Sequence, residues 1–233
     1  MIPAKPASEM SRAELASYID HSVLKPDFTR DEIRKYILEG IDLGCKTVCI
    51  NPSAIVIAKE LCSGTETGIC AVCDFPFGLS STESKALQAR EICQHEGVVE
   101  LDIVSNYGWI RSDLYDLVEY DIRAVCDACR DHGTAVKVIL ETDALTEIEI
   151  VNATTACIAA GADFVKTSTG FFTGGKSEGA AEEVVRLILD TAADRIQVKA
   201  SGGIRTRERL LSLIDMGVDR IGIGCKSTSE VLG

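Results

Sequence analysis

No stretch of this 233-residue sequence stays apolar for the roughly 20 consecutive residues that a transmembrane helix needs. The opening residues also lack the apolar core and the small-residue cleavage site of a secretion signal. Basic residues are in deficit, since 24 Lys and Arg against 36 Asp and Glu give a formal net charge of −12. Such a surface repels nucleic acid and anionic membranes, so we expect neither as a partner. An anionic small substrate is still compatible, because local groups set the field inside a pocket.

Linkers, charge runs and low-complexity segments are missing as well, so we expect one domain over residues 1–233. Within it, residues 1–10 are expected to form a flexible N-terminal segment. The hydrophobic fraction of 46% is sufficient for a sizeable core.

Cysteine, in contrast, is abundant, with 10 residues. Cys70 and Cys73 form one CxxC pattern, and Cys126 and Cys129 form another, which could indicate metal or redox chemistry. The first pair lies in a strand-like run, where residues three apart face opposite sides. The second lies in a helical pattern, and cysteine is a common small core residue. We therefore expect structural thiols and no metal site. Reduced thiols without a signal sequence indicate the cytoplasm.

Short β-branched runs alternate with longer amphipathic stretches from end to end. The expected strands are Tyr18–Leu24, Thr47–Asn51, Thr67–Asp74, Val98–Ser105, Ala135–Glu141, Asp163–Ser168, Gln197–Ser201 and Arg220–Gly224. The expected helices cover Thr29–Gly44, Ser81–His95, Ser112–His132, Thr146–Ala160, Glu178–Ala193 and Thr206–Met216, with a short extra N-terminal helix after Ser11. Eight strands that alternate with helices in 233 residues predict an α/β fold, a (β/α)₈ TIM barrel. A doubly wound open sheet is the rival, but its glycine-rich dinucleotide turn is missing.

Several of the expected strands carry ionisable residues, and active sites of barrels lie where strands end. Asp102 lies on the fourth strand, Lys137 on the fifth, Lys166 on the sixth and Lys199 on the seventh. A single buried lysine is as often half of a structural ion pair. Three lysines on neighbouring strands inside an apolar barrel favour a functional reading, because unpaired buried ammonium groups are costly.

The chemistry that these lysines favour is imine formation. Repulsion and partial desolvation lower the pKa of one lysine, and the neutral amine attacks a carbonyl. The protonated imine then withdraws electrons from the adjacent carbon–carbon bond, as aldol cleavage requires, while Asp102 moves protons through a bound water. Spacing alone does not choose between Lys166 and Lys199 as the nucleophile.

Glycine-rich turns follow the last strands and predict a phosphate site, because backbone N–H groups can approach an anion closely there. Gly202 and Gly203 follow the seventh strand, and Gly224 and Cys225 follow the eighth. Gly170, after the sixth strand, is expected to form another wall of the same pocket.

Seven motifs, in order across nearly the whole chain, resemble those of the deoxyribose-phosphate aldolase family. They are IDHSVLKP (19–26), VCINP (48–52), DFPFG (74–78), ELDIV (100–104), KVILET (137–142), ADFVKTSTGF (162–171) and VKASGGIRT (198–206). The last two are highly specific.

The resemblance implies a class I aldolase of TIM-barrel fold that cleaves 2-deoxy-D-ribose 5-phosphate reversibly to acetaldehyde and D-glyceraldehyde 3-phosphate, in deoxyribose catabolism. It makes Lys166 the Schiff-base lysine, with Asp102 and Lys199 as the proton donor and acceptor pair. It implies no metal or organic cofactor, a phosphorylated sugar as the partner, and a homodimer. The expected substrate-binding residues are Asp20, Cys49, Lys137, Thr167, Gly170, Gly202, Gly203, Gly224 and Cys225.

The turn after the eighth strand departs from the family, which usually has two small hydroxyl residues where this chain has Gly224 and Cys225. The neighbouring Lys226 either compensates for the lost contacts or faces solvent. Two alternatives therefore stay open: a related class I aldolase acting on another sugar or sugar phosphate, and a catalytically silent binding protein.

Overall fold

The computed structural model describes residues 2–233, which form a closed barrel of eight parallel strands. Each strand pairs with the next along the chain, and β8 closes the ring on β1. The strands are β1 Ile19–Val23, β2 Thr47–Ile50, β3 Gly68–Cys73, β4 Val98–Val104, β5 Ala135–Ile139, β6 Phe164–Lys166, β7 Gln197–Ser201 and β8 Arg220–Gly224. All eight expected strands and the TIM-barrel fold are confirmed.

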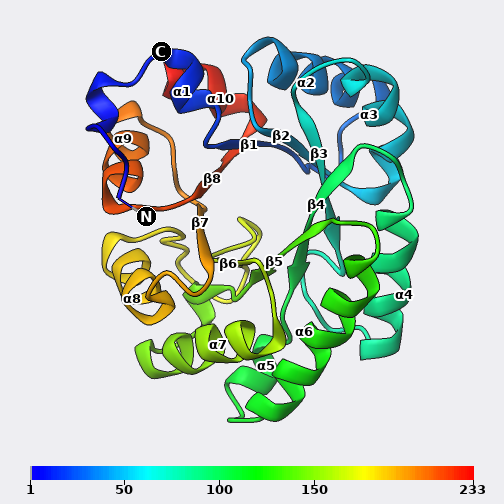
Figure 1. Cartoon of the computed structure of the whole chain (residues 1–233), viewed down its shortest axis with the longest axis vertical. Helices are drawn as coiled ribbons and strands as arrows, with labels where there is room; N and C mark the ends of the chain where they lie inside the picture. The colour runs from blue at the N-terminus through cyan, green and yellow to red at the C-terminus, as the bar shows by residue number, and fades with distance from the viewer. Residues whose placement is uncertain (1) are drawn as a thin grey trace.

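Helices surround the barrel as a ring (Figure 1). They are α1 Arg12–Ala16, α2 Arg30–Asp42, α3 Ile55–Cys62, α4 Thr82–Cys93, α5 Tyr107–Ile110, α6 Tyr115–Arg130, α7 Glu147–Ala160, α8 Glu182–Ala192, α9 Arg207–Met216 and α10 Cys225–Leu232. Short 3-10 turns occur at Ala7–Glu9, Pro52–Ala54 and Thr142–Ala144. The extra N-terminal helix α1 begins with the expected capping box at Ser11.

Three of these helices, α3, α5 and α10, were not among the expected elements. Two of them lack the signal that marks a helix start, because the N-cap residues of α3 and α10, Ala54 and Gly224, accept no hydrogen bond through a side chain. Helix α5 is a single turn of four residues. None of the helices in residues 2–233 combines the length and the apolar character that a membrane span requires.

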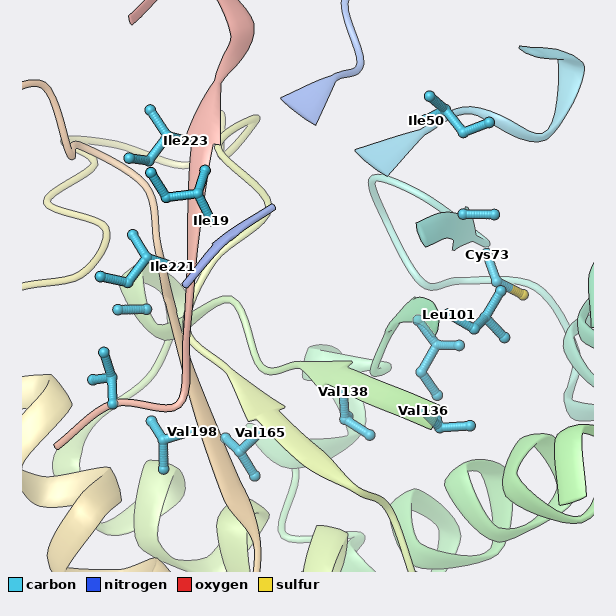
Figure 2. Packing of buried hydrophobic residues seen from close by; sticks show 14 of the residues in the cluster. Ile19, Ile50, Cys73, Leu101, Val136, Val138, Val165, Val198, Ile221 and Ile223 are labelled. Carbon is cyan, nitrogen blue, oxygen red and sulfur yellow. The ribbon is translucent and has the colours of Figure 1, made fainter. Parts of the chain in front are cut away.

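The main hydrophobic core lies between the strands and the helices. Residues on the outer face of the barrel alternate with inward-facing ones, and Leu101, Val138, Val165, Val198 and Ile221 are among the outward-facing residues in Figure 2. The apolar side chains are therefore used to attach the helices, and the inward positions are left for other residue types.

The N-terminal segment is docked over part of its length. Ala7 is buried, and its backbone N–H donates to Asp215 Oδ1 on α9 at 2.7 Å. Residues 7–9 of the expected flexible segment form a 3-10 turn that is attached at Ala7, and the flexibility expected over residues 1–10 stays a prediction. Met1 lies outside the described residues.

Candidate active site

Asp102 on β4 is fully buried in the barrel interior and lies at the centre of three lysines. Its Oδ2 accepts from Lys166 Nζ and from Lys199 Nζ, at 2.7 Å each, and its Oδ1 accepts from Lys137 Nζ at 3.0 Å. The register explains this convergence, because Lys166 and Lys199 are partners on β6 and β7 while Lys137 pairs with Phe164, two residues lower. The three residues expected to be catalytic are thus brought together.

Three more charged residues complete the interior, and we call the seven residues the charge cluster: Asp20, Glu100, Asp102, Lys137, Lys166, Lys199 and Arg220. Lys199 Nζ lies 2.5 Å from Asp20, and Lys137 Nζ lies 2.5 Å from Glu100. Arg220 Nη1 lies 2.8 Å from Asp20 and 2.7 Å from Glu100. The expectation that the lysines lie in an apolar interior is therefore wrong. Carboxylates form ion pairs with the lysines and offset most of the repulsion between them.

Sequence reasoning missed Glu100 and Arg220 as members of the cluster. Glu100 lies two residues before Asp102, so the alternation of a strand places both side chains on the inner face. Arg220 is the first residue of β8, and nothing local in the sequence indicates that it points inward.

The charges of the cluster follow from competition between burial and ion pairing. Burial favours neutral Asp102, but Lys137, Lys166 and Lys199 outweigh it and hold the pKa of Asp102 well below its ordinary value. Burial likewise opposes a charge on Lys199, yet Asp102 and Asp20 raise its pKa above the usual value. Asp102 is consequently a carboxylate and Lys199 an ammonium near neutral pH.

A pocket of about 250 Å³ opens at the carboxyl ends of the strands. Within the charge cluster, Lys166 alone lines this pocket, and only 2% of its surface is exposed. Sequence left the choice between Lys166 and Lys199 open without the family resemblance, whereas the geometry makes Lys166 the amine that a bound molecule reaches.

The glycine-rich turns meet around this pocket, as expected. Five of the expected substrate-binding residues line it: Gly170, Gly202, Gly203, Gly224 and Cys225. The other four are buried behind its wall: Asp20, Cys49, Lys137 and Thr167. Contacts with neighbouring residues hold them there; the Thr167 hydroxyl, for example, donates to Ser201 O at 2.7 Å.

Cationic side chains dominate the mouth of the pocket. Lys25, Arg205 and Lys226 line it, and no carboxylate does. Lys25 Nζ lies 5.3 Å from the centre of the Phe171 ring, and Lys226 Nζ lies 5.4 Å from that of Phe28. Lys226 therefore takes part in the pocket. Lys25 and Arg205 were not identified beforehand, because a surface cation carries no pattern that distinguishes it from a solvated one.

The ten cysteines are free thiols and are all buried. Cys70 faces the interior, with Sγ 3.1 Å from Asp102 Oδ1, whereas Cys73 faces outward and donates to Gln88. The expectation that Cys70 and Cys73 point to opposite faces of the strand is confirmed. The thiols of Cys49 and Cys70 and the carboxylate of Asp102 lie close enough together to be considered as ligands of one metal ion. That set is a poor cation site, because lysine ammonium groups already surround the carboxylate.

Comparison with known proteins agrees with this geometry. Residues 15–227 match the DeoC/LacD family aldolase model. The deoxyribose-phosphate aldolase of Finegoldia magna is 45% identical over 209 residues, which is 90% of this chain and 95% of that one. That of Mannheimia succiniciproducens is 45% identical over 213 residues, covering 91% and 92% of the two chains.

Solved structures agree as well. The structure titled QR15, an Aldolase, superposes with a TM-score of 0.84 at 39% identity, over 94% of each chain. The tetrameric deoxyribose phosphate aldolase of Aeropyrum pernix superposes with a TM-score of 0.85 at 30% identity, over 95% of this chain and 91% of that one. The chain belongs to the DeoC/LacD family of aldolases.

Proposed function

We propose that this protein is a class I aldolase that cleaves 2-deoxy-D-ribose 5-phosphate reversibly to acetaldehyde and D-glyceraldehyde 3-phosphate. The observation that carries the proposal is that Lys166, alone in the charge cluster, lines the pocket, while its Nζ is bonded to the Asp102 carboxylate. The names of the relatives from Finegoldia magna and Mannheimia succiniciproducens supply the substrate.

The reaction starts when Lys166 releases its proton to water in the pocket, which leaves a neutral amine to attack C1 of the open-chain sugar. Loss of water from the carbinolamine gives a protonated imine. The C3 hydroxyl then gives its proton to Asp102 through a bound water, and the C2–C3 bond breaks. Its electron pair moves into an enamine on Lys166, and D-glyceraldehyde 3-phosphate leaves. Protonation at C2 and hydrolysis release acetaldehyde and restore the amine. Lys199, an ammonium 2.7 Å from Asp102, is placed to return protons through the same carboxylate.

The phosphate of the substrate fits the cationic side of the pocket. Lys25, Arg205 and Lys226 surround that side together with the glycine turns after β7 and β8. Helix α10 begins at Cys225, so its free N–H groups lie at the same place and favour an anion. In this chain, backbone donors and lysines take the role that hydroxyl side chains have in relatives.

Trapping with borohydride tests the proposal. Incubation with 2-deoxyribose 5-phosphate and sodium borohydride should reduce the imine and leave a covalent adduct, which peptide mass spectrometry should map to Lys166. An adduct confined to exposed lysines, or an unmodified chain, would refute the proposed chemistry.

A related class I aldolase with a different sugar is the second candidate, and Gly224 with Cys225 at the strand-eight turn favours it. Comparison of kcat/KM for deoxyribose and its 5-phosphate separates the two, because only the first proposal requires a strong preference for the phosphate. A silent binding protein is the third candidate, and measurable turnover of either sugar would eliminate it.

A cytoplasmic homodimer is our proposal for location and assembly. It is supported by ten thiols that are all unpaired and by the family resemblance. The relative from Aeropyrum pernix is tetrameric, so light scattering of the purified protein should distinguish two chains from four.

A further inference from the structure

The loop between β6 and α8, residues 167–181, forms one wall of the pocket. Thr169, Gly170 and Phe171 line the pocket, whereas residues 173–178 are exposed to solvent. A wall of this length needs attachment at both ends if it is to present a fixed shape to a ligand. Two carboxylates from the neighbouring loop after β5 provide that attachment.

Glu141 holds the start of the loop. Its side chain is buried, and its carboxylate accepts from the Thr169 backbone N–H at 3.2 Å and also from the Thr169 hydroxyl. The Thr169 Oγ1 in turn accepts from the Phe171 N–H at 2.9 Å. Glu141 has a left-handed backbone, with φ 58° and ψ 63°. Such a conformation is strained for an L-residue and persists only where the surroundings impose it.

Asp143 holds the end of the same loop. Its carboxylate accepts from the Glu178 N–H at 2.8 Å, the Gly179 N–H at 3.1 Å and the Ser177 hydroxyl at 2.8 Å. Gly179 is pressed against the turn after β7, since a Cβ there would lie 2.5 Å from Gly202 O. Gly202 lines the pocket, so Asp143 ties the far end of the loop to the glycine turn on the cationic side.

We propose that Glu141 and Asp143 are positioning residues that clamp the β6–α8 loop and so set the affinity of the pocket for its sugar phosphate. Neither residue lines the pocket, so both act through Thr169, Phe171 and Gly179. This role concerns the shape of the pocket wall and rests on the proposed function. Lys166, and not the clamp, forms the imine.

The charge of Glu141 makes the clamp sensitive to pH. Burial raises the pKa of Glu141, the hydrogen bonds from Thr169 lower it, Asp143 raises it further, and Lys166 lowers it, with a net upward shift. A protonated Glu141 has one oxygen fewer to accept from Thr169. The clamp therefore loosens on the acidic side of neutrality, earlier than an ordinary carboxylate would.

Steady-state kinetics with isosteric variants test the clamp. E141Q and D143N should each raise the KM for 2-deoxyribose 5-phosphate about tenfold, because hydrogen bonds to a charged acceptor are lost, while kcat falls much less. Borohydride trapping of Lys166 with saturating acetaldehyde should persist in both variants. The matched control is E147Q, which removes an exposed carboxylate from the first turn of α7 and should leave KM unchanged. The KM of the unmodified protein should rise at acidic pH, and E141Q should show a smaller rise, which leaves only the part that comes from protonation of the substrate phosphate.

Tryptic cleavage gives a readout that does not need activity. The exposed Lys176 lies in the middle of the loop, so E141Q and D143N should be cut there faster than the control. T169V removes the hydroxyl that donates to Glu141 and keeps the backbone N–H bond, so it serves as the second variant in the cleavage assay if E141Q does not fold. An unchanged KM and an unchanged cleavage rate in the folded variants would overturn the clamp. Failure of trapping in the unmodified protein would instead refute the proposed function.

Discussion

Lys166 and Lys199 are register partners on the adjacent strands β6 and β7, and their Nζ atoms donate to the same oxygen of Asp102. One carboxylate oxygen thereby joins the amine that lines the pocket to an ammonium that does not. Asp102 Oδ2 lies 2.7 Å from both Nζ atoms, so this one oxygen fixes the position of both lysines. In the proposed mechanism, this arrangement supplies the nucleophile and the proton relay from one buried cluster.

Replacement of Lys166 by methionine should abolish turnover, because a thioether cannot form an imine. Lys166→Arg should be equally inactive, since a guanidinium keeps its proton and is not nucleophilic. The aldehyde released from 2-deoxyribose 5-phosphate, followed through a coupled dehydrogenase, measures both variants. Residual activity above about a thousandth of the original rate would contradict the role of Lys166, as loss of a covalent catalyst costs more than that.

Replacement of Lys199 by leucine should lower kcat by about 10²- to 10⁴-fold, the range typical for loss of a proton-transfer group. Lys166 is still present in this variant, so the imine should form and should be trapped by borohydride, though more slowly. Complete loss of trapping with an intact fold would show that Lys199 is needed for imine formation itself.

Replacement of Asp102 by asparagine should reduce both activity and stability. The change removes the carboxylate that three buried lysines share, and an uncompensated buried charge costs about 3–5 kcal/mol. We expect a kcat lowered by orders of magnitude together with a lower midpoint of urea unfolding. A variant with unchanged stability would indicate that Asp20 and Glu100 alone neutralise the lysines.

Replacement of Lys226 by glutamine should lower kcat/KM for 2-deoxyribose 5-phosphate by about 3- to 10-fold, a modest effect because the side chain is exposed. The value for unphosphorylated deoxyribose should stay the same, since the charge acts on the phosphate. Equal losses for the two sugars would remove Lys226 from phosphate recognition.

The stability of the protein should fall as the pH drops from about 6.5 to 4. Burial lowers the pKa of His21 to about 4, from an ordinary value of 6.5. Between these pH values His21 is protonated in the unfolded chain but stays neutral in the folded chain. The free energy of unfolding therefore decreases by about 3 kcal/mol on acidification and then levels off.

A His21→Asn variant isolates this contribution. Asparagine has no proton to gain in this range and can keep a hydrogen bond to Thr228 Oγ1, which lies 2.9 Å from His21 Nδ1. The difference in unfolding free energy between the two proteins, measured with urea, should change by about 3 kcal/mol between pH 7 and pH 4. A constant difference would exclude His21 as the titrating group.

Much of the barrel could be predicted because its signals are local. β-Branched runs marked every strand, and capping side chains at Ser11, Thr29 and Thr146 marked three helix starts. Helices α3 and α10 lack such caps and were missed, and Ala7 is docked by a contact with Asp215, more than 200 positions away in the sequence.

The sequence by itself determined the fold class, the strand positions and the set of candidate residues around Lys166, because periodicity and motif order are properties of neighbouring positions. Only the tertiary structure decided that Lys166 and not Lys199 reaches the pocket, that Arg220 and Glu100 neutralise the interior, and that Glu141 holds Thr169. These are distances between side chains from different strands. Closure of the barrel sets them, and no local pattern in the chain encodes how deep each side chain will lie.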